Sequence, residues 1–365
     1  NGLCIIPMAG LAMKIGMRRQ ILRACFCASA AYFTAVASPF FGEAGVMVLI
    51  ASVFLFAFSL TGFIAGWFPL LDTFLEPERR TLFFSRMRFC HQLSGTVFLF
   101  LVGFVIGGNP PVWGLQLVLL AAAVIFTGRA AAISRIPVFE GRQNESAGFF
   151  SGLNTVVGNK PMAGFSLYFF LLNLTAFGTV PLMMLYLKNG LNAPDNVIVL
   201  ISACSLSGML FGYLCIGRLL KRIGMKHTFL LLHFIFFAVN GGLFLIGGRS
   251  MATYLLIAFF LLVYSFAAAA SSIVASAEMM KLASPGNKIM AMAFNGAFFY
   301  GGSGLSRFLT SLLLGSGMFA AEWQLGTTTV CRYRTFLLLY CAAILLAAPF
   351  LLLVPAVNSG KSNKP

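Results

Sequence analysis

The feature that most constrains this chain is a series of long apolar stretches without any Asp, Glu, Lys or Arg, such as 44–70, 161–187 and 251–277. A helix needs about 20 apolar residues to cross the hydrocarbon core of a bilayer. Strands of a membrane barrel alternate apolar and polar residues, and no such alternation occurs here. Charged residues make up only 9% of the chain, against about a quarter in soluble domains. The sequence therefore predicts an all-α membrane protein.

We expect about eleven transmembrane helices. Residues 1–13 are apolar but too short to span, and form either the end of a helix or an interfacial piece. The other expected spans are roughly 20–40, 46–70, 83–108, 112–134, 161–187, 196–217, 228–247, 251–277, 289–314 and 335–355.

The basic residues divide unevenly between alternate loops. Twenty Lys and Arg lie in one set of loops and only four (Lys188, Arg249, Arg332 and Arg334) in the other, while Arg307 lies within a span. The positive-inside rule places the first set in the cytoplasm. We therefore expect a multi-pass protein of the cell (plasma or inner) membrane with a cytoplasmic C-terminus. The net charge of +16 follows from these loops and does not indicate nucleic acid as a partner.

Two loops repeat along the chain. Residues 14–19 (KIGMRR) resemble 222–227 (RIGMKH), and Gly16 and Gly224 are 208 residues apart, as are Pro77 and Pro285. This repeat predicts an N-terminal helix bundle 1–134, a cytoplasmic linker 135–160, a C-terminal bundle 161–356 and a cytoplasmic tail 357–365. It also predicts about 48 further residues upstream, with a first helix that this chain lacks.

Two such halves, each with a basic Gly-containing loop, resemble the major facilitator superfamily (MFS). The family's loop pattern is Gly-x-x-x-Asp-Arg/Lys-x-Gly-x-Arg/Lys-Arg/Lys, and its Asp is replaced here by Met13 and Lys221. The resemblance implies two six-helix bundles, and a gating role for the loops stays open beside a purely topological one. The matching residues are Lys14, Gly16, Arg18, Arg19, Gly217, Arg222, Gly224 and Lys226.

Polar residues inside spans are candidates for substrate binding, because burying them in a membrane is costly. Tyr300, Ser303 and Arg307 are spaced so that they share one helical face. The resemblance adds residues on the helices at 161–187 and 251–277, which line the central cavity in that family. The full set of candidates is His91, Gln92, Tyr168, Asn173, Tyr264, Asn295, Tyr300 and Arg307, with Ser265 and Ser303 beside them. Gly208 and Gly212, and Gly103 and Gly107, fit close helix packing.

The leading interpretation is secondary active or facilitative transport of a small solute by alternating access between two bundles. The alternatives are an MFS-like lipid or lysolipid flippase, a non-transporting sensor and, less well supported, a membrane-embedded enzyme. The acidic residues are scattered and the three histidines have no acidic neighbour in sequence, so no catalytic group is indicated. We expect no enzyme activity, no cofactor and no metal site, and a monomer whose partners are its solute and membrane lipid.

The charge distribution makes the topology testable. Reporter fusions within 135–160 and after Val354 should report a cytoplasmic location, whereas a fusion near Arg249 should report the opposite side. A fusion in either of the first two positions that reports the outside would contradict the predicted helix order.

Overall fold

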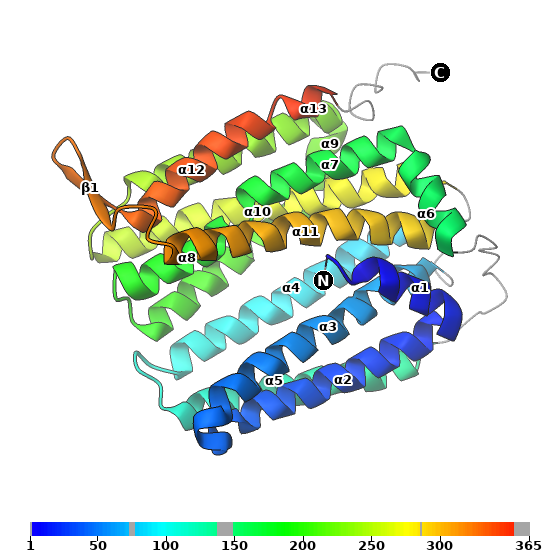
Figure 1. Cartoon of the computed structure of the whole chain (residues 1–365), viewed down its shortest axis with the longest axis horizontal. Helices are drawn as coiled ribbons and strands as arrows, with labels where there is room; N and C mark the ends of the chain where they lie inside the picture. The colour runs from blue at the N-terminus through cyan, green and yellow to red at the C-terminus, as the bar shows by residue number, and fades with distance from the viewer. Residues whose placement is uncertain (1, 73–76, 137–148, 285–286, 354–365) are drawn as a thin grey trace. The chain divides into compact units, whose positions relative to one another are not determined.

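The computed structural model describes residues 2–72, 77–136, 149–284 and 287–353. Helices make up most of them (Figure 1). The earlier elements are α1 (Ile5–Ile15), α2 (Met17–Ala37), η1 (Ser38–Ala44), α3 (Gly45–Asp72), α4 (Pro77–Val105), α5 (Val112–Ser134) and α6 (Phe149–Gly158). The later elements are α7 (Lys160–Ala176), α8 (Thr179–Leu185), η3 (Tyr186–Gly190), α9 (Asp195–Leu245), α10 (Met251–Leu282), α11 (Lys288–Gly315), β1 (Glu322–Leu325), β2 (Thr328–Cys331), α12 (Arg332–Ala347) and α13 (Phe350–Leu353).

The predicted all-α membrane fold is confirmed. Seven stretches of described helix are long and apolar enough to cross a membrane. One of them, Met17–Trp67, contains both α2 and α3, which the 3₁₀ turn η1 separates at Gly42 (φ 54°). Helix α11 is not among the seven, because glycines and polar side chains lower its hydropathy. The chain is a multi-pass membrane protein.

Three local features differ from the expected spans. The span predicted at 161–187 is confirmed as Lys160–Gly190, but it is not one regular helix, because Phe177 and Gly178 separate α7 from α8. Pro181 has no N–H to donate to the carbonyl four residues earlier, so it interrupts the helical ladder there. The region predicted as a linker contains helix α6, and an unpredicted antiparallel hairpin, β1–β2, precedes α12.

Packing divides the chain into two compact units. Unit 1 comprises Asn1–Arg80, Pro110–Lys160 and Met279–Gly301, and unit 2 comprises Thr81–Asn109, Pro161–Glu278 and Gly302–Pro365. Each unit therefore contains helices from both halves of the sequence. In unit 2, α4 packs on α9, where the Gly108 carbonyl accepts a hydrogen bond from the Asp195 N–H. The predicted bundles, linker and tail rest on the sequence repeat and stay a prediction.

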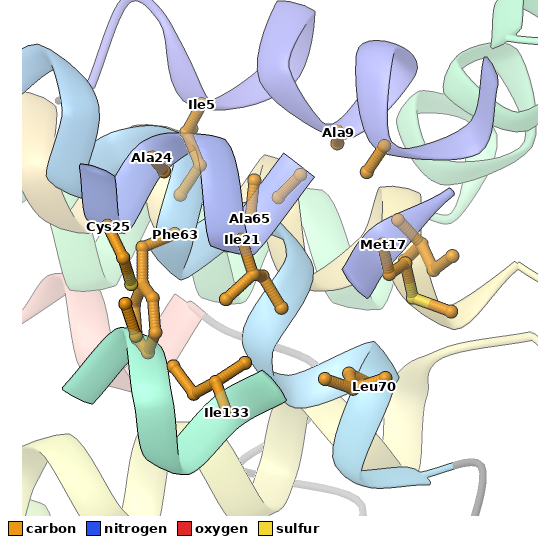
Figure 2. Close-up of a cluster of buried hydrophobic side chains, with 14 residues drawn as sticks. Ile5, Ala9, Met17, Ile21, Ala24, Cys25, Phe63, Ala65, Leu70 and Ile133 are labelled. Atoms are coloured by element: carbon orange, nitrogen blue, oxygen red, sulfur yellow. The ribbon is translucent and has the colours of Figure 1, made fainter. Parts of the chain in front are cut away.

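A core of small and aliphatic side chains holds unit 1 together. Figure 2 shows Phe63 and Cys25 beside Ile133, from α3, α2 and α5. Alanines fill much of the remainder, which lets the helices approach closely. The buried members are Ile5, Ala9, Ala12, Met17, Ile21, Ala24, Cys25, Phe63, Ala65, Leu70, Ala130, Ile133, Ile289 and Ala293.

Close packing at Gly208 and Gly212 is confirmed in unit 2. A Cβ atom at Gly208 would lie 2.0 Å from the Leu262 carbonyl oxygen, and one at Gly212 would lie 2.6 Å from the Phe266 carbonyl oxygen. Backbones of α9 and α10 therefore touch where no side chain fits. The prediction also holds for Gly103, which faces Leu200, but not for Gly107, which has open space around it and φ 71°.

The two repeated loops have related backbone conformations. Gly16, between α1 and α2, has φ 89° and ψ 135°, and Gly224, inside α9, has φ 75° and ψ 173°. Residues other than glycine rarely adopt such angles. The chain thus reverses direction at corresponding positions of the repeat, as the sequence predicted.

Alanine at Gly224 should lower the thermal stability of the purified protein, because positive φ in this region costs about 1–3 kcal/mol for a residue with a side chain. Gly217→Ala is the matched control, since Gly217 lies in the same helix, is exposed and has nothing within 4 Å of its Cβ position. We expect the control to keep or slightly raise the melting temperature in detergent. Equal melting temperatures for the two variants would contradict the assignment of Gly224 as the obligatory turn residue.

Candidate substrate site

The break between α7 and α8 brings polar groups into the interior of unit 2. The Ala176 carbonyl at the end of α7 accepts a hydrogen bond from the Tyr264 hydroxyl at 2.6 Å and from the Thr179 hydroxyl at 3.0 Å. Thr179 also lies 2.9 Å from the Asn240 side-chain oxygen on α9. These side chains satisfy backbone that the helix break would otherwise leave exposed to hydrocarbon.

Tyr168 on α7 belongs to a cluster of aromatic side chains. Its hydroxyl is 3.5 Å from His233 Nδ1, and the two rings are stacked with centroids 5.8 Å apart. His233 Nδ1 lies 2.9 Å from the Phe229 carbonyl, so the proton sits on Nδ1 and the neutral ring presents Nε2 as an acceptor. Nε2 is buried and has no partner among the described residues.

Two predicted asparagines carry unpaired oxygens. Asn173 on α7 donates its amide N–H to the Phe169 carbonyl, and its side-chain oxygen is buried without a partner in the described chain. The side-chain oxygen of Asn295 on α11 is in the same situation. Asn173 belongs to unit 2 and Asn295 to unit 1.

Helix α4 carries the two candidates at 91 and 92. Gln92 is buried and its amide nitrogen lies 3.4 Å from the Leu206 carbonyl on α9. His91 is exposed on the same helix. Gln92 therefore faces α9 within unit 2.

Helix α11 is continuous, so Tyr300, Ser303 and Arg307 share one face as predicted. Ser303 is buried, Tyr300 is half-buried and Arg307 is exposed. Arg307 is 19 residues beyond Lys288, which corresponds to about 28 Å of helical rise.

The loop motif residues of the first repeat flank the turn between α1 and α2, and those of the second lie in α9 around its break at Gly224. Arg18 donates a hydrogen bond from Nη2 to the Ser134 carbonyl at the end of α5. Lys14, Arg19, Gly217 and Arg222 are exposed and Lys226 is half-buried. A basic side chain on the last carbonyls of a helix is favourable because the dipole places negative charge there.

Sequence reasoning missed several polar groups in the interior. Arg334 was counted in a loop, which is wrong: it lies in α12, is buried, and donates to the Phe244 carbonyl at 2.7 Å and the Thr329 carbonyl at 3.2 Å. The hairpin above it is fixed by Trp323, whose indole N–H donates to the Thr335 hydroxyl at 2.8 Å. Nothing in the local pattern around Arg334 distinguishes a buried arginine from a loop arginine.

Two further groups were also missed. Thr310 of α11 and Tyr340 of α12 are joined through their hydroxyls. Arg129 of α5, which looked like an interfacial residue, has its guanidinium 3.6 Å from the centre of the Phe63 ring. The described residues contain no group of three or more His, Cys, Asp or Glu that could hold a metal ion.

Comparison with known proteins identifies the fold. The nucleoside transporter NupG is similar with a TM-score of 0.66 and 16% identity, over 97% of this chain and 87% of that one. The E. coli fucose:proton symporter FucP gives 0.65 and 11% identity, over 95% and 87%. The human organic anion transporter MFSD10 gives 0.64 and 16%, over 96% and 80%.

The sequence itself gives the family. No match is found among curated proteins, but the model of the Major Facilitator Superfamily matches residues 1–306. That match covers most of the chain and agrees with the loops at Gly16 and Gly224. The protein is thus a member of the Major Facilitator Superfamily of membrane transporters.

Proposed function

We propose that this protein is a secondary transporter that moves a small polar solute across the cell membrane by alternating access between its bundles. The observation that carries the proposal is the buried side-chain oxygen of Asn173 in unit 2, which has no hydrogen-bond partner among the described residues. Leaving a buried acceptor unsatisfied costs about 1–3 kcal/mol. A solute that donates hydrogen bonds would remove this cost while it is bound.

The polar side chains of unit 2 favour a solute rich in hydroxyl or N–H groups. Tyr264 and Thr179 supply uncharged groups, and Arg307 supplies the one cation among the predicted binding residues. FucP and NupG are named for fucose and nucleosides, and MFSD10 for organic anions. These solutes all carry hydroxyl or anionic groups, which is consistent with the donors and acceptors found here.

The repeat supports the mechanism. Alternating access requires two similar bundles that can rearrange around a central site. Gly16 and Gly224 give the two halves corresponding turns, and we propose the bundles 1–134 and 161–356 as the moving parts. We further propose a monomer with its C-terminus in the cytoplasm.

Asparagine-to-alanine variants separate binding from folding. Asn173 and Asn240 are both fully buried and both donate to the carbonyl four residues earlier. Only Asn240 has a partner for its oxygen, Thr179. Asn240→Ala should therefore cost about 0.5–1.5 kcal/mol more stability than Asn173→Ala, the net contribution of one hydrogen bond, measured by thermal unfolding in detergent.

Uptake should show the opposite order. We expect proteoliposomes to accumulate at least one labelled monosaccharide, nucleoside or small organic anion. Asn173→Ala should lose most of this uptake and Asn240→Ala should keep it per folded molecule. Translocation of a fluorescent phospholipid without solute uptake would favour the flippase alternative, and neither activity would favour a sensor.

Arg307 gives an independent test of the same site. Arg307→Ala removes the charge and Arg307→Lys keeps it but loses the planar fork of donors. Both should impair uptake at normal membrane abundance if the guanidinium meets an anionic or polar group of the solute. Arg249→Ala is the control, because Arg249 is exposed and lies in a predicted outer loop. Wild-type uptake by Arg307→Ala would leave Arg307 as a residue that only reaches the lipid headgroups.

A further inference from the structure

Outside the candidate site, unit 1 carries a group of basic side chains where α1 and α5 end and α2 begins. None of them pairs with a carboxylate in the part of the chain that the structure describes. The group consists of Lys14, Arg18, Arg19, Arg23 and Arg135.

One hydrogen bond joins the start of α2 to the end of α5. Arg18 donates from Nη2 to the Ser134 carbonyl in the last turn of α5. Arg135 is the next residue along the chain, and Arg19 is the next residue along α2. The contact therefore places basic residues of both helices at the same end of unit 1, where their charges add.

The exposed face of α2 carries basic side chains near the start of the helix and apolar side chains further along. Arg19, Arg23, Phe26 and Phe33 lie on one side of the helix, because their spacing follows the helical period. Phe26 is 64% exposed and Phe33 is 41% exposed. From Arg19 to Phe33 the helix rises about 21 Å, which is comparable to much of a hydrocarbon core.

Helix α5 packs on α2 with its other side. Phe126 of α5 contacts Tyr32 of α2, with ring centroids 5.6 Å apart, and the exposed Gly128 and Val124 lie on the opposite face of α5. The cationic end and the apolar stripe therefore belong to the exposed face of α2.

We propose that this surface binds an anionic phospholipid, with the phosphate at Arg19 and Arg23 and an acyl chain along Phe26 and Phe33. Guanidinium groups bind phosphate with paired, charge-assisted hydrogen bonds. Basic pockets between transmembrane helices are suited to anionic headgroups. A soluble phosphate would use the charges but not the apolar stripe, so the stripe favours a lipid. This inference goes beyond the proposed transport activity.

The test measures binding of phosphatidylglycerol and phosphatidylcholine with identical acyl chains to the purified protein, by native mass spectrometry. We expect phosphatidylglycerol to bind about tenfold more tightly, and Arg19→Gln/Arg23→Gln to remove about that factor. Arg218→Gln/Arg222→Gln is the control, since both residues are exposed and the charge loss is the same. The control should change the ratio less than about twofold.

Two further arms identify the ligand. Phe26→Ala should weaken binding of both lipids, because the acyl chain loses its contact. Glycerol 3-phosphate should not compete at millimolar concentration; if it does, the site binds a soluble anion and the lipid assignment is overturned. Equal losses in the two arginine pairs would also overturn it, since the effect would then be general charge. None of these measurements involves transport, so their failure leaves the proposed function standing.

Discussion

The constraint on which the rest of this structure depends is that a membrane offers no water to backbone groups, so every N–H and C=O must find a partner within the protein. Continuous helices meet this requirement by themselves. Where a helix stops or breaks, a side chain serves the free carbonyl: Arg18 at the end of α5, Arg334 at the end of α9 and Tyr264 at the end of α7. These three side chains therefore lie at discontinuities of the helices.

The same constraint separates structural polar groups from functional ones. Asn240 accepts a hydrogen bond from the Thr179 hydroxyl next to the α7–α8 break and donates one to the Phe236 carbonyl. Asn173 occupies a similar position on α7, yet its oxygen has no described partner. An oxygen that is costly to bury and accepts no hydrogen bond in the described part of the chain needs another explanation, and we propose that a bound solute provides one.

The sequence alone predicted the membrane fold, the spans and the turn glycines, because these depend on long-range averages of hydropathy and on a repeated motif. It missed the break at Phe177 and Gly178, although Pro181 carried a signal for it. It also missed the burial of Arg334, which depends on carbonyls of α9 and of β2 that only the tertiary structure brings near. Among the candidate residues, the sequence identified side chains that are buried or that share a helical face. Whether each polar atom has a hydrogen-bond partner depends on the tertiary structure, and hydropathy contains no information on such partners.

The hairpin β1–β2 carries a tryptophan whose fluorescence depends on the position of the hairpin. The protein has three tryptophans, and their surroundings differ. Trp67 stacks on Phe63 with ring centroids 5.1 Å apart, and Trp113 is 65% exposed on α5. Trp323 is the one whose indole N–H is bonded to a neighbouring hydroxyl, that of Thr335. Indole emission depends on such bonds and on solvent, so a protein that keeps only Trp323 would carry an intrinsic fluorophore reporting when the hairpin leaves the end of α12.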